Sequence, residues 1–325
     1  YTPRSMTEPI VRKTLEPILK RLGDDAGAKG ITPAQILELK VCDPAMGSGA
    51  FLVEACRQLA DELVEAWRRH GSMPVIPPDE DELLYARRIV AQRCLYGVDK
   101  NPMAADLAKL SIWLATLAKD HPFTFLDHSF RTGDSIVGLT RAQIEDFTWE
   151  QTKGRQKQFY AAAIGERIEA ALAARREILD AGDFKSPEVK KQKLTVADER
   201  LDLVRFIGDL AVAAFFAGAK DKQRKEKRQE FLQELTAYLG DRSKLGSGSA
   251  SGDISKRPQK PVDSLRAGEK GVTPFHWEIE FPEVFGRGQS GFDAIVGNPP
   301  FMGGSKISAA FGRQYLEWLL CVNER

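Results

Sequence analysis

The chain has 325 residues, of which 42% are hydrophobic and 29% are charged, and its formal net charge is +1. This length and apolar content are sufficient for one large or two ordinary domains with a sizeable core. Because positive and negative charges nearly cancel, the composition gives no overall electrostatic case for a nucleic-acid partner, and any such contact must come from local clusters.

The cysteine and histidine spacing argues against a metalloprotein, and the lengths of the apolar runs argue against a membrane protein. The four cysteines form no Cys-x-x-Cys pair and the four histidines lack metal-ligand spacing, so we expect no metal site. Free cysteines such as Cys42 and Cys94, in strand-like runs, behave as small hydrophobic residues and are typical of a reducing cytosol. The longest apolar stretch, 207–219, contains Asp209 and is too short to cross a bilayer of about 30 Å. We therefore expect a cytoplasmic protein without a membrane segment.

The first 140 residues show an alternating pattern of helices and strands. Apolar residues recur at helical spacing over 6–22, with Gly23 as a stop signal and Pro17 as an expected kink. Alternation of this kind is typical of an α/β fold with a parallel sheet. In chain order, the further predictions are a strand over 37–43, helices over 50–69 and 80–92, a strand over 94–99, a helix from Pro102 to about Lys119, and a short strand before Gly133.

The alternating pattern is interrupted after residue 140. Residues 141 to about 245 are highly charged with helical apolar spacing, which predicts an inserted helical hairpin or bundle. The Gly- and Ser-rich run 246–252 favours a flexible linker. The pattern resumes near Trp277, and 292–297 is the predicted fourth strand. The predicted parts are an α/β part (1–140), a charged helical insertion with its linker (141–270), and a second α/β part (271–325).

A glycine-rich turn follows the first predicted strand. Residues 43–52 read Asp-Pro-Ala-Met-Gly-Ser-Gly-Ala-Phe-Leu, which lets the backbone approach a nucleotide-like ligand at a helix N-terminus. A dinucleotide fingerprint would need a third glycine at position 52, which is leucine, so a nicotinamide cofactor is disfavoured. Asp43 can accept hydrogen bonds from a cationic amino group. Asp99 ends the second strand, where doubly wound sheets place an acid against two ribose hydroxyls.

The fourth predicted strand ends in Asn298-Pro299-Pro300-Phe301. The exocyclic amine of a purine is a poor nucleophile because its lone pair is delocalised, so an activating site must accept hydrogen bonds from both amine hydrogens. The Asn298 side-chain oxygen and the Pro299 carbonyl can do this, and the two prolines fix the turn. Phe301 can stack on the base. An isolated Asn-Pro-Pro is often only a turn at a strand end, and the upstream motifs favour the functional interpretation.

The order of these motifs, with Tyr1-Thr2-Pro3 at the start, resembles the gamma group of N6-adenine DNA methyltransferases, including the Eco57I-like enzymes of restriction-modification and phage-defence systems. The resemblance implies a Rossmann-like class I methyltransferase fold, with a doubly wound, mostly parallel sheet and a long helical insertion. It further implies S-adenosylmethionine as cofactor, double-stranded DNA with a flipped adenine as substrate, and a bacterial or archaeal cytoplasm as location.

Specific residues are assigned by the same resemblance. In the family, the Tyr-Thr-Pro segment lies over the methionine moiety of the cofactor. Asp134, after the predicted third strand, could accept a hydrogen bond from the adenine amine of the cofactor, with Ser135 beside it, or could be a plain turn aspartate. The implied catalytic residues are Asn298, Pro299, Pro300 and Phe301. The implied cofactor-binding residues are Tyr1, Thr2, Pro3, Asp43, Pro44, Ala45, Gly47, Gly49, Phe51, Asp99, Lys100, Asp134, Ser135 and Asn298.

The resemblance covers both flanks of the insertion and ends soon after the fourth strand. The family's later strands, its remaining adenine-pocket motifs and any target-recognition domain should follow Arg325. We therefore expect the rest of the enzyme on a longer polypeptide or a separate chain, with restriction or defence subunits as further partners. On this expectation, the segment by itself could be inactive.

Other functions stay open from the sequence. A cytosine-C5 methyltransferase is disfavoured because the chain lacks the Pro-Cys dipeptide of its nucleophile. A protein-glutamine N5 methyltransferase shares the Asn-Pro-Pro-aromatic motif but ordinarily lacks the Tyr-Thr-Pro opening and the insertion. A non-catalytic module of a defence complex is a third alternative. The basic run 220–228 could touch DNA phosphates, although its interleaved Asp221 and Glu226 are more typical of a solvated helix face.

Overall fold

The computed structural model describes residues 2–76, 80–116, 126–150, 157–180, 187–240 and 256–323. They form two compact units. The first unit consists of Tyr1–Thr132, Glu177–Gln192 and Arg287–Pro299, and the second of Gly133–Arg176, Lys193–Gly286 and Pro300–Arg325. Packing thus groups residues 271–286 with the inserted helices, whereas the sequence pattern groups them with the last strand. Tyr1 and the predicted linker 246–252 lie outside the described residues.

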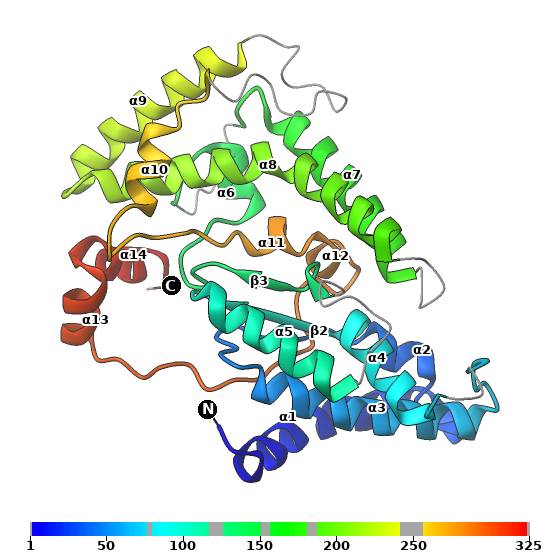
Figure 1. Ribbon diagram of the computed structural model, residues 1–325. Coiled ribbons are helices and arrows are strands. Elements are labelled where there is room, and N and C mark those ends of the chain that lie inside the picture. Colours follow the sequence, from blue (N-terminus) through cyan, green and yellow to red (C-terminus); the bar gives the residue numbers. More distant parts are fainter. Residues whose placement is uncertain are drawn as a thin grey trace. The chain divides into compact units, whose positions relative to one another are not determined.

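The described part of the first unit is built on four parallel strands in the order β3-β2-β1-β4. Figure 1 labels β2 and β3 of this sheet. Val41 pairs with Leu95 on one side and with Ala294 on the other, so β1 is flanked by β2 and β4. The strand order reverses at β1, and ligands of open α/β sheets bind beside the carboxyl ends of the strands at such a point. This is the Rossmann-like arrangement that the sequence predicts. The strands are β1 (Val41–Asp43), β2 (Leu95–Asp99), β3 (Phe130–Thr132) and β4 (Ala294–Ile295).

The helices of the first unit pack against the strands, and both contribute side chains to one apolar core. Leu52, Leu59 and Leu63 of α3 recur at helical spacing and are completely buried, which is the amphipathic pattern that predicts this helix. Gly71 ends α3 in a left-handed conformation, a common helix C-cap. The helices are α1 (Arg4–Asp25), η1 (Gly27–Lys29), α2 (Pro33–Glu38), α3 (Ala50–His70), α4 (Glu82–Cys94) and α5 (Pro102–Thr116).

Two predictions for the first 40 residues are wrong. The predicted strand over 37–43 begins late, because Thr32 and Gln35 form a capping box that starts α2, with Pro33 in its first turn. Only the last three residues of that range form β1. Gly23 does not stop α1, which continues to Asp25. A glycine inside a helix costs about 1 kcal/mol, and the packing of α1 on α3 offsets this cost.

The second unit is helical and has a core of its own. Val204, Ile207, Leu210 and Ala211 on α8 are completely buried in it. Helices therefore form in the predicted insertion, and they share the core with the helices that follow the last strand. The helices that lie wholly or, for α7 and α8, mainly in this unit are α6 (Arg141–Asp146), α7 (Ala161–Asp180), α8 (Pro187–Ala217), α9 (Asp221–Leu239), α10 (Lys260–Arg266), α11 (Trp277–Glu280), α12 (Pro282–Phe285), α13 (Gly304–Phe311) and α14 (Arg313–Asn323).

The two ends of the insertion lie side by side within the second unit. Phe275 N donates to Val137 O at 2.7 Å, and Asp134 N donates to Thr273 O at 2.8 Å. A methyl group on Gly138 would lie 2.0 Å from the Phe275 carbonyl oxygen, so only glycine permits this approach. Backbone hydrogen bonds thus close the base of the insertion.

Two ion pairs, one buried and one partly buried, hold α11 and α12 against the inserted helices. Arg175 of α7 binds Glu283 through two hydrogen bonds of 2.6 and 2.8 Å, with both side chains almost fully buried. Arg205 of α8 binds Glu280 in the same bidentate way, at 2.6 and 3.0 Å. Bidentate arginine–carboxylate pairs fix orientation as well as distance. These contacts explain why residues 274–286 pack with the insertion.

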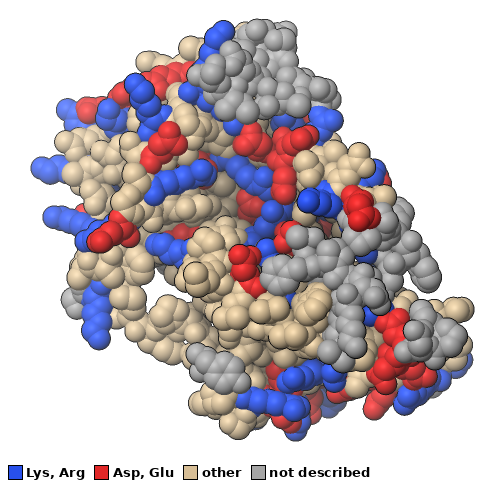
Figure 2. Space-filling view, in the orientation of Figure 1, with Lys and Arg blue, Asp and Glu red and all other residues tan. Residues whose placement is uncertain are grey.

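The basic run at the start of α9 is largely paired with acidic side chains. Lys225 lies 2.9 Å from Asp221 and 3.6 Å from Glu150, and Lys227 lies 2.8 Å from Glu230. Basic and acidic side chains lie next to one another along this helix (Figure 2). The arrangement is that of a solvated, ion-paired face. Among the described helices, none combines the length and apolar content needed to cross a bilayer.

Substitution Glu283→Leu should lower the free energy of unfolding by about 3 kcal/mol, because it leaves the Arg175 guanidinium buried without its carboxylate. The double variant Arg175→Met/Glu283→Leu should recover most of this loss. Chemical denaturation measures both, with Glu230→Ala in the exposed Lys227 pair as a control that costs less than about 1 kcal/mol. A single variant as stable as the unaltered protein would contradict the assigned importance of the pair.

Candidate active site

The glycine turn connects β1 to α3 through two left-handed glycines. Gly47 has φ 52° and Gly49 has φ 78°, a backbone region that strongly favours glycine. A methyl group on Gly49 would lie 3.1 Å from the Ala108 Cβ atom, so α5 packs tightly against the turn. By contrast, a methyl group on Gly47 would meet no atom within 4 Å. The turn therefore has a packed side at Gly49 and an open side at Gly47.

Asp43 is a buried acid at the start of this turn. Its side chain is 1% exposed, and its Oδ1 accepts from Ala45 N at 3.0 Å. Burial raises the pKa of Asp43 to about 7, with a smaller contribution from the nearby Asp99 carboxylate and an opposing one from the Ala45 hydrogen bond. Burial makes the ionised form of this carboxyl group costly, so a cation placed beside it would interact with it strongly.

Asp99 joins the end of β2 to the same turn. Its Oδ2 accepts from Gly47 N at 2.9 Å, and its Oδ1 accepts from Asn101 N at 2.8 Å. The predicted cofactor turn and the predicted ribose acid are thus in direct contact. Gly97 supports this contact, because a methyl group there would lie 2.3 Å from the Met46 sulfur atom. The sequence predicted Asp43, Gly47, Gly49 and Asp99 separately, and the structure brings them together.

The turn after β4 lies against the turn after β1. Val296 N donates to Cys42 O at 2.9 Å, so the pairing of the two strands extends to their carboxyl ends. A methyl group on Gly297 would lie 2.6 Å from Asp43 Oδ1. Gly297 directly precedes Asn298, which is exposed. The first unit therefore places the buried acid beside the residue that leads into the Asn-Pro-Pro motif.

The remaining predicted site residues vary in exposure. Pro299 is the last residue of the first unit, and Pro300 and Phe301 begin the last part of the second. The Phe301 ring is 91% exposed, which leaves its faces open for stacking. Phe51 is buried in the core, 4% exposed, while Lys100 is exposed. Their assignment to the cofactor stays a prediction, as do the assignments of Pro44 and Ala45 in the turn.

Asp134 and Ser135 follow β3 and belong to the second unit. Asp134 is 3% exposed, and its Oδ1 accepts from the Tyr315 hydroxyl at 3.0 Å. The Ser135 carbonyl accepts from Trp277 Nε1 at 2.9 Å. Both residues are thus held by parts of the chain that follow the insertion.

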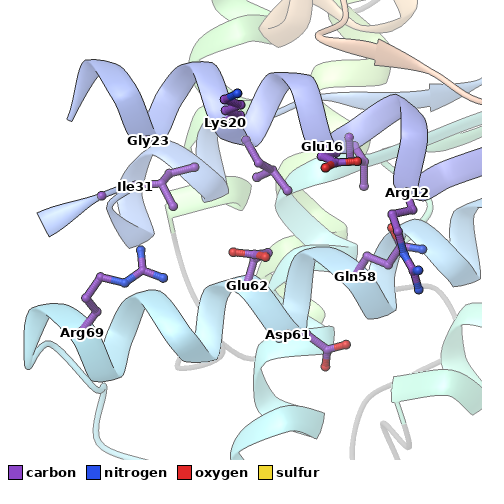
Figure 3. A pocket seen from close by; sticks show the side chains of 12 residues that line it. Arg12, Glu16, Lys20, Gly23, Ile31, Gln58, Asp61, Glu62 and Arg69 are labelled. Atoms are coloured by element: carbon purple, nitrogen blue, oxygen red, sulfur yellow. The ribbon is translucent and has the colours of Figure 1, made fainter. Parts of the chain in front are cut away.

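Two cavities of the first unit border α1 and α3. One of about 670 Å³ lies between the two helices and is lined by side chains of both charge signs, including Arg12, Glu16 and Glu62 (Figure 3). It contains no predicted site residue. The other, of about 390 Å³, is lined by Thr2 and by Ser48 and Ala50 of the glycine turn. The structure thus brings Thr2, from the predicted N-terminal element, to the side of the turn, and Pro3 follows as the N-cap residue of α1.

Sequence reasoning missed three residues near the predicted ones. Gly297 makes room for Asp43, Tyr315 binds Asp134, and Ile136 exposes 54% of its side chain beside Ser135. A glycine directly before Asn298 was a readable signal for a close approach. The Tyr315 contact spans most of the chain, and a single sequence gives no signal for it. No group of His, Cys, Asp or Glu within the described ranges could hold a metal ion.

Comparisons with known families identify the same regions. The family profile of the Eco57I restriction-modification methylase matches residues 93–319, more than half of the chain. The profile of the DNA-methyltransferase domain of MmeI matches residues 30–136, which include the glycine turn. No solved structure gives a significant match.

Two curated proteins are similar to the chain. A protein of Methanocaldococcus jannaschii, named as a candidate type II restriction enzyme and methyltransferase, is 25% identical over 93% of this chain and 28% of its own length. The type II restriction enzyme and methyltransferase Eco57I of Escherichia coli is 26% identical over 42% of this chain and 14% of its own length. The chain thus spans less than a third of either relative.

Substitution Asp43→Asn should remove a pH dependence of stability. Aspartate titrates near pH 4 in an unfolded chain, whereas the pKa of Asp43 in the folded protein is about 7. Between these values the folded state holds a proton that the unfolded state has lost, so the stability contributed by the neutral acid falls as pH rises from 4 to 7. Asparagine cannot ionise and should lack this fall, which is on the order of 3 kcal/mol.

Urea unfolding at about pH 4.5 and about pH 8, close to the two ends of this titration range, measures the effect. The exposed Asp106, whose carboxylate is 66% exposed, supplies the matched control Asp106→Asn. This control should keep the pH dependence of the unaltered protein. The same pH dependence in Asp43→Asn would contradict the raised pKa.

Proposed function

Because the chain belongs to the Eco57I restriction-modification methylase family, we propose that it transfers a methyl group from S-adenosylmethionine to the N6 amine of adenine in DNA. One observation carries this proposal. A methyl group on Gly297 would lie 2.6 Å from Asp43 Oδ1, so the turn that carries Asn298 and the buried acid of the glycine turn are neighbours in one compact unit. An amine acceptor and a cation acceptor at such short range suit methyl transfer from a charged donor to a base.

The residues of the first unit fit an adenosyl cofactor that carries an amino acid. Gly47 offers open space beside its backbone, Asp43 offers a buried carboxylate for a cationic amino group, and Asp99 offers acceptors for ribose hydroxyls. Thr2 borders the turn from the side of α1. When bound, S-adenosylmethionine supplies an electrophilic methyl group. We assign Tyr1, Thr2 and Pro3 to its methionine end and Asp134 with Ser135 to its adenine end.

Each residue of the Asn298–Phe301 motif has a distinct role in the proposal. The Asn298 side-chain oxygen and the Pro299 carbonyl accept the two amine hydrogens and keep the nitrogen lone pair available for attack. Pro299 and Pro300 restrict the turn, because proline fixes φ near −65°. The exposed Phe301 ring stacks on the adenine after it leaves the duplex. Positioning supplies most of the rate increase, and no strong base is needed.

The partners and the location are also proposals. Relatives that carry both restriction and methyltransferase names are much longer than this chain. We propose that the natural protein combines this segment with target-recognition or restriction functions on the same or another chain. A bacterial or archaeal cytoplasm, where DNA and S-adenosylmethionine are both present, is the proposed location.

Substitution Asn298→Ala should lower methyl transfer to adenine N6 by about 100-fold or more, because it removes one acceptor of the transition state. The complete natural protein that contains this chain is expressed in cells, and methylated bases in their DNA are mapped by sequencing. Gln229→Ala, which removes an exposed side-chain amide on α9, is the matched control and should keep the pattern.

An unchanged N6-methyladenine pattern in Asn298→Ala would remove the proposed catalytic role. Methyl transfer to a release-factor protein in place of DNA would support a protein-glutamine methyltransferase. A complete natural protein that does not bind S-adenosylmethionine in calorimetry would support a non-catalytic module.

Substitution Gly297→Ala should weaken binding of S-adenosylhomocysteine about tenfold, since the new methyl group displaces the Asp43 carboxylate by steric overlap. Titration calorimetry on the complete natural protein measures the affinity. Gly288→Ala in the same unit meets no atom within 4 Å and should bind normally. Normal affinity in both variants would show that the close approach of Gly297 and Asp43 does not matter for the cofactor.

A further inference from the structure

The turn after β3 belongs to the second unit and is held in place by hydrogen bonds from residues of the same unit that follow the inserted helices. Asp134 N donates to Thr273 O at 2.8 Å, and Trp277 Nε1 donates to the Ser135 carbonyl at 2.9 Å. Phe275 packs against Gly133 so closely that a methyl group there would lie 2.8 Å from its ring. The backbone at Asp134 is therefore fixed, and the orientation of its carboxylate depends on the donors around the side chain.

Tyr315 is one of those donors. Its hydroxyl lies 3.0 Å from Asp134 Oδ1, and Ile136 N donates to the same oxygen at 3.2 Å. Burial, with the adjacent Asp134 carboxylate, raises the pKa of Tyr315 above its ordinary value. The hydroxyl thus keeps its proton, and the carboxylate is the acceptor. Such charge-assisted hydrogen bonds are stronger and more directional than those between neutral groups.

The Tyr315 hydroxyl is aimed by the packing of its ring. Tyr315 is 5% exposed and stacks on Phe311, with ring centroids 4.9 Å apart and an interplanar angle of 27°. One helical turn further along α14, Trp318 is completely buried and packs edge-on against Phe215. Because these aromatic contacts fix the helix and the ring, the hydroxyl has little freedom to leave Asp134.

We infer that Tyr315 is a positioning residue for adenine recognition, which orients the Asp134 carboxylate to accept a hydrogen bond from the 6-amino group of the cofactor. The inference rests on the proposed function, since it takes an adenosyl cofactor as ligand. A structural role alone would bury the tyrosine ring and satisfy a polar group, and it would not depend on the substituent at C6 of the purine. That substituent therefore separates the two roles.

The test compares two ligands and uses the complete natural protein. S-adenosylhomocysteine carries the 6-amino group, and S-inosylhomocysteine carries a 6-oxo group that cannot donate to a carboxylate. Tyr315→Phe should weaken binding of the adenosyl ligand about threefold to tenfold, as expected for one lost hydrogen bond, and leave binding of the inosyl ligand unchanged. Titration calorimetry measures both affinities.

Tyr160→Phe is the matched control. Tyr160 belongs to the same unit and is completely buried, and its hydroxyl has no hydrogen-bond partner among the described residues. Removal of this hydroxyl should leave both affinities unchanged. Thermal unfolding of the two variants verifies that each is folded.

A second variant tests the inference through a gain of affinity for one ligand as well as a loss of affinity for the other. Asp134→Asn should weaken the adenosyl ligand and strengthen the inosyl ligand, because its amide can donate to the 6-oxo group. Adding Tyr315→Phe to Asp134→Asn should reduce this reversed preference, since the amide then loses one of the two donors that orient it.

Three results would overturn the inference. The first is an unchanged adenosyl affinity in Tyr315→Phe, and the second is an equal loss for both ligands, which indicates a structural role. The third is a reversed preference that is undiminished in the double variant. Failure of the unaltered protein to bind either ligand would instead overturn the proposed function, and the inference with it.

Discussion

The close approach of β1 and β4 at their carboxyl ends is the constraint on which the candidate site depends. Hydrogen bonding between the two strands reaches Val296, and the absence of a side chain at Gly297 lets the Asp43 carboxylate lie against the backbone that leads to Asn298. On the other side of β1, Gly47 N binds Asp99. The buried strand β1 therefore aligns the carboxyl ends of β2 and β4, which pair with it on either side. These short strands are enough to hold the site together, because a side chain also joins the turns that follow β1 and β2.

A buried acid at this position destabilises the protein in the absence of a cationic partner. Burial raises the pKa of Asp43 to about 7, which means that ionisation at neutral pH is costly. Functional sites commonly hold such perturbed groups, because the same burial that destabilises the empty site strengthens its interaction with a charged ligand. In the proposed function, burial of Asp43 lowers the stability of the folded protein and raises its affinity for the cationic cofactor.

The sequence predicted contiguous features well and distant contacts poorly. The helix over 50–69 and the strand over 94–99 are present as α3 (Ala50–His70) and β2 (Leu95–Asp99), because a buried face imposes a readable apolar pattern. The motif residues could be proposed from the sequence because each motif is continuous in it. The start of α2 was missed because the capping chemistry of Thr32 outweighs the alternation that follows it. The bond between Tyr315 and Asp134 joins residues far apart in the chain, and no periodicity encodes such a bond.

The closed base of the insertion has a consequence for how this chain can vary. Phe275 pairs with Val137, and Gly138 lies against the Phe275 carbonyl, so the excursion begins and finishes at one anchored point. The entropy of closing a loop grows only slowly with its length. Connections between the inserted helices could therefore lengthen at modest thermodynamic cost, whereas α8 could not be removed without exposing the core that it shares with α14. Such a base would let evolution, or a protein engineer, vary the length of the excursion while its core helices stay in place.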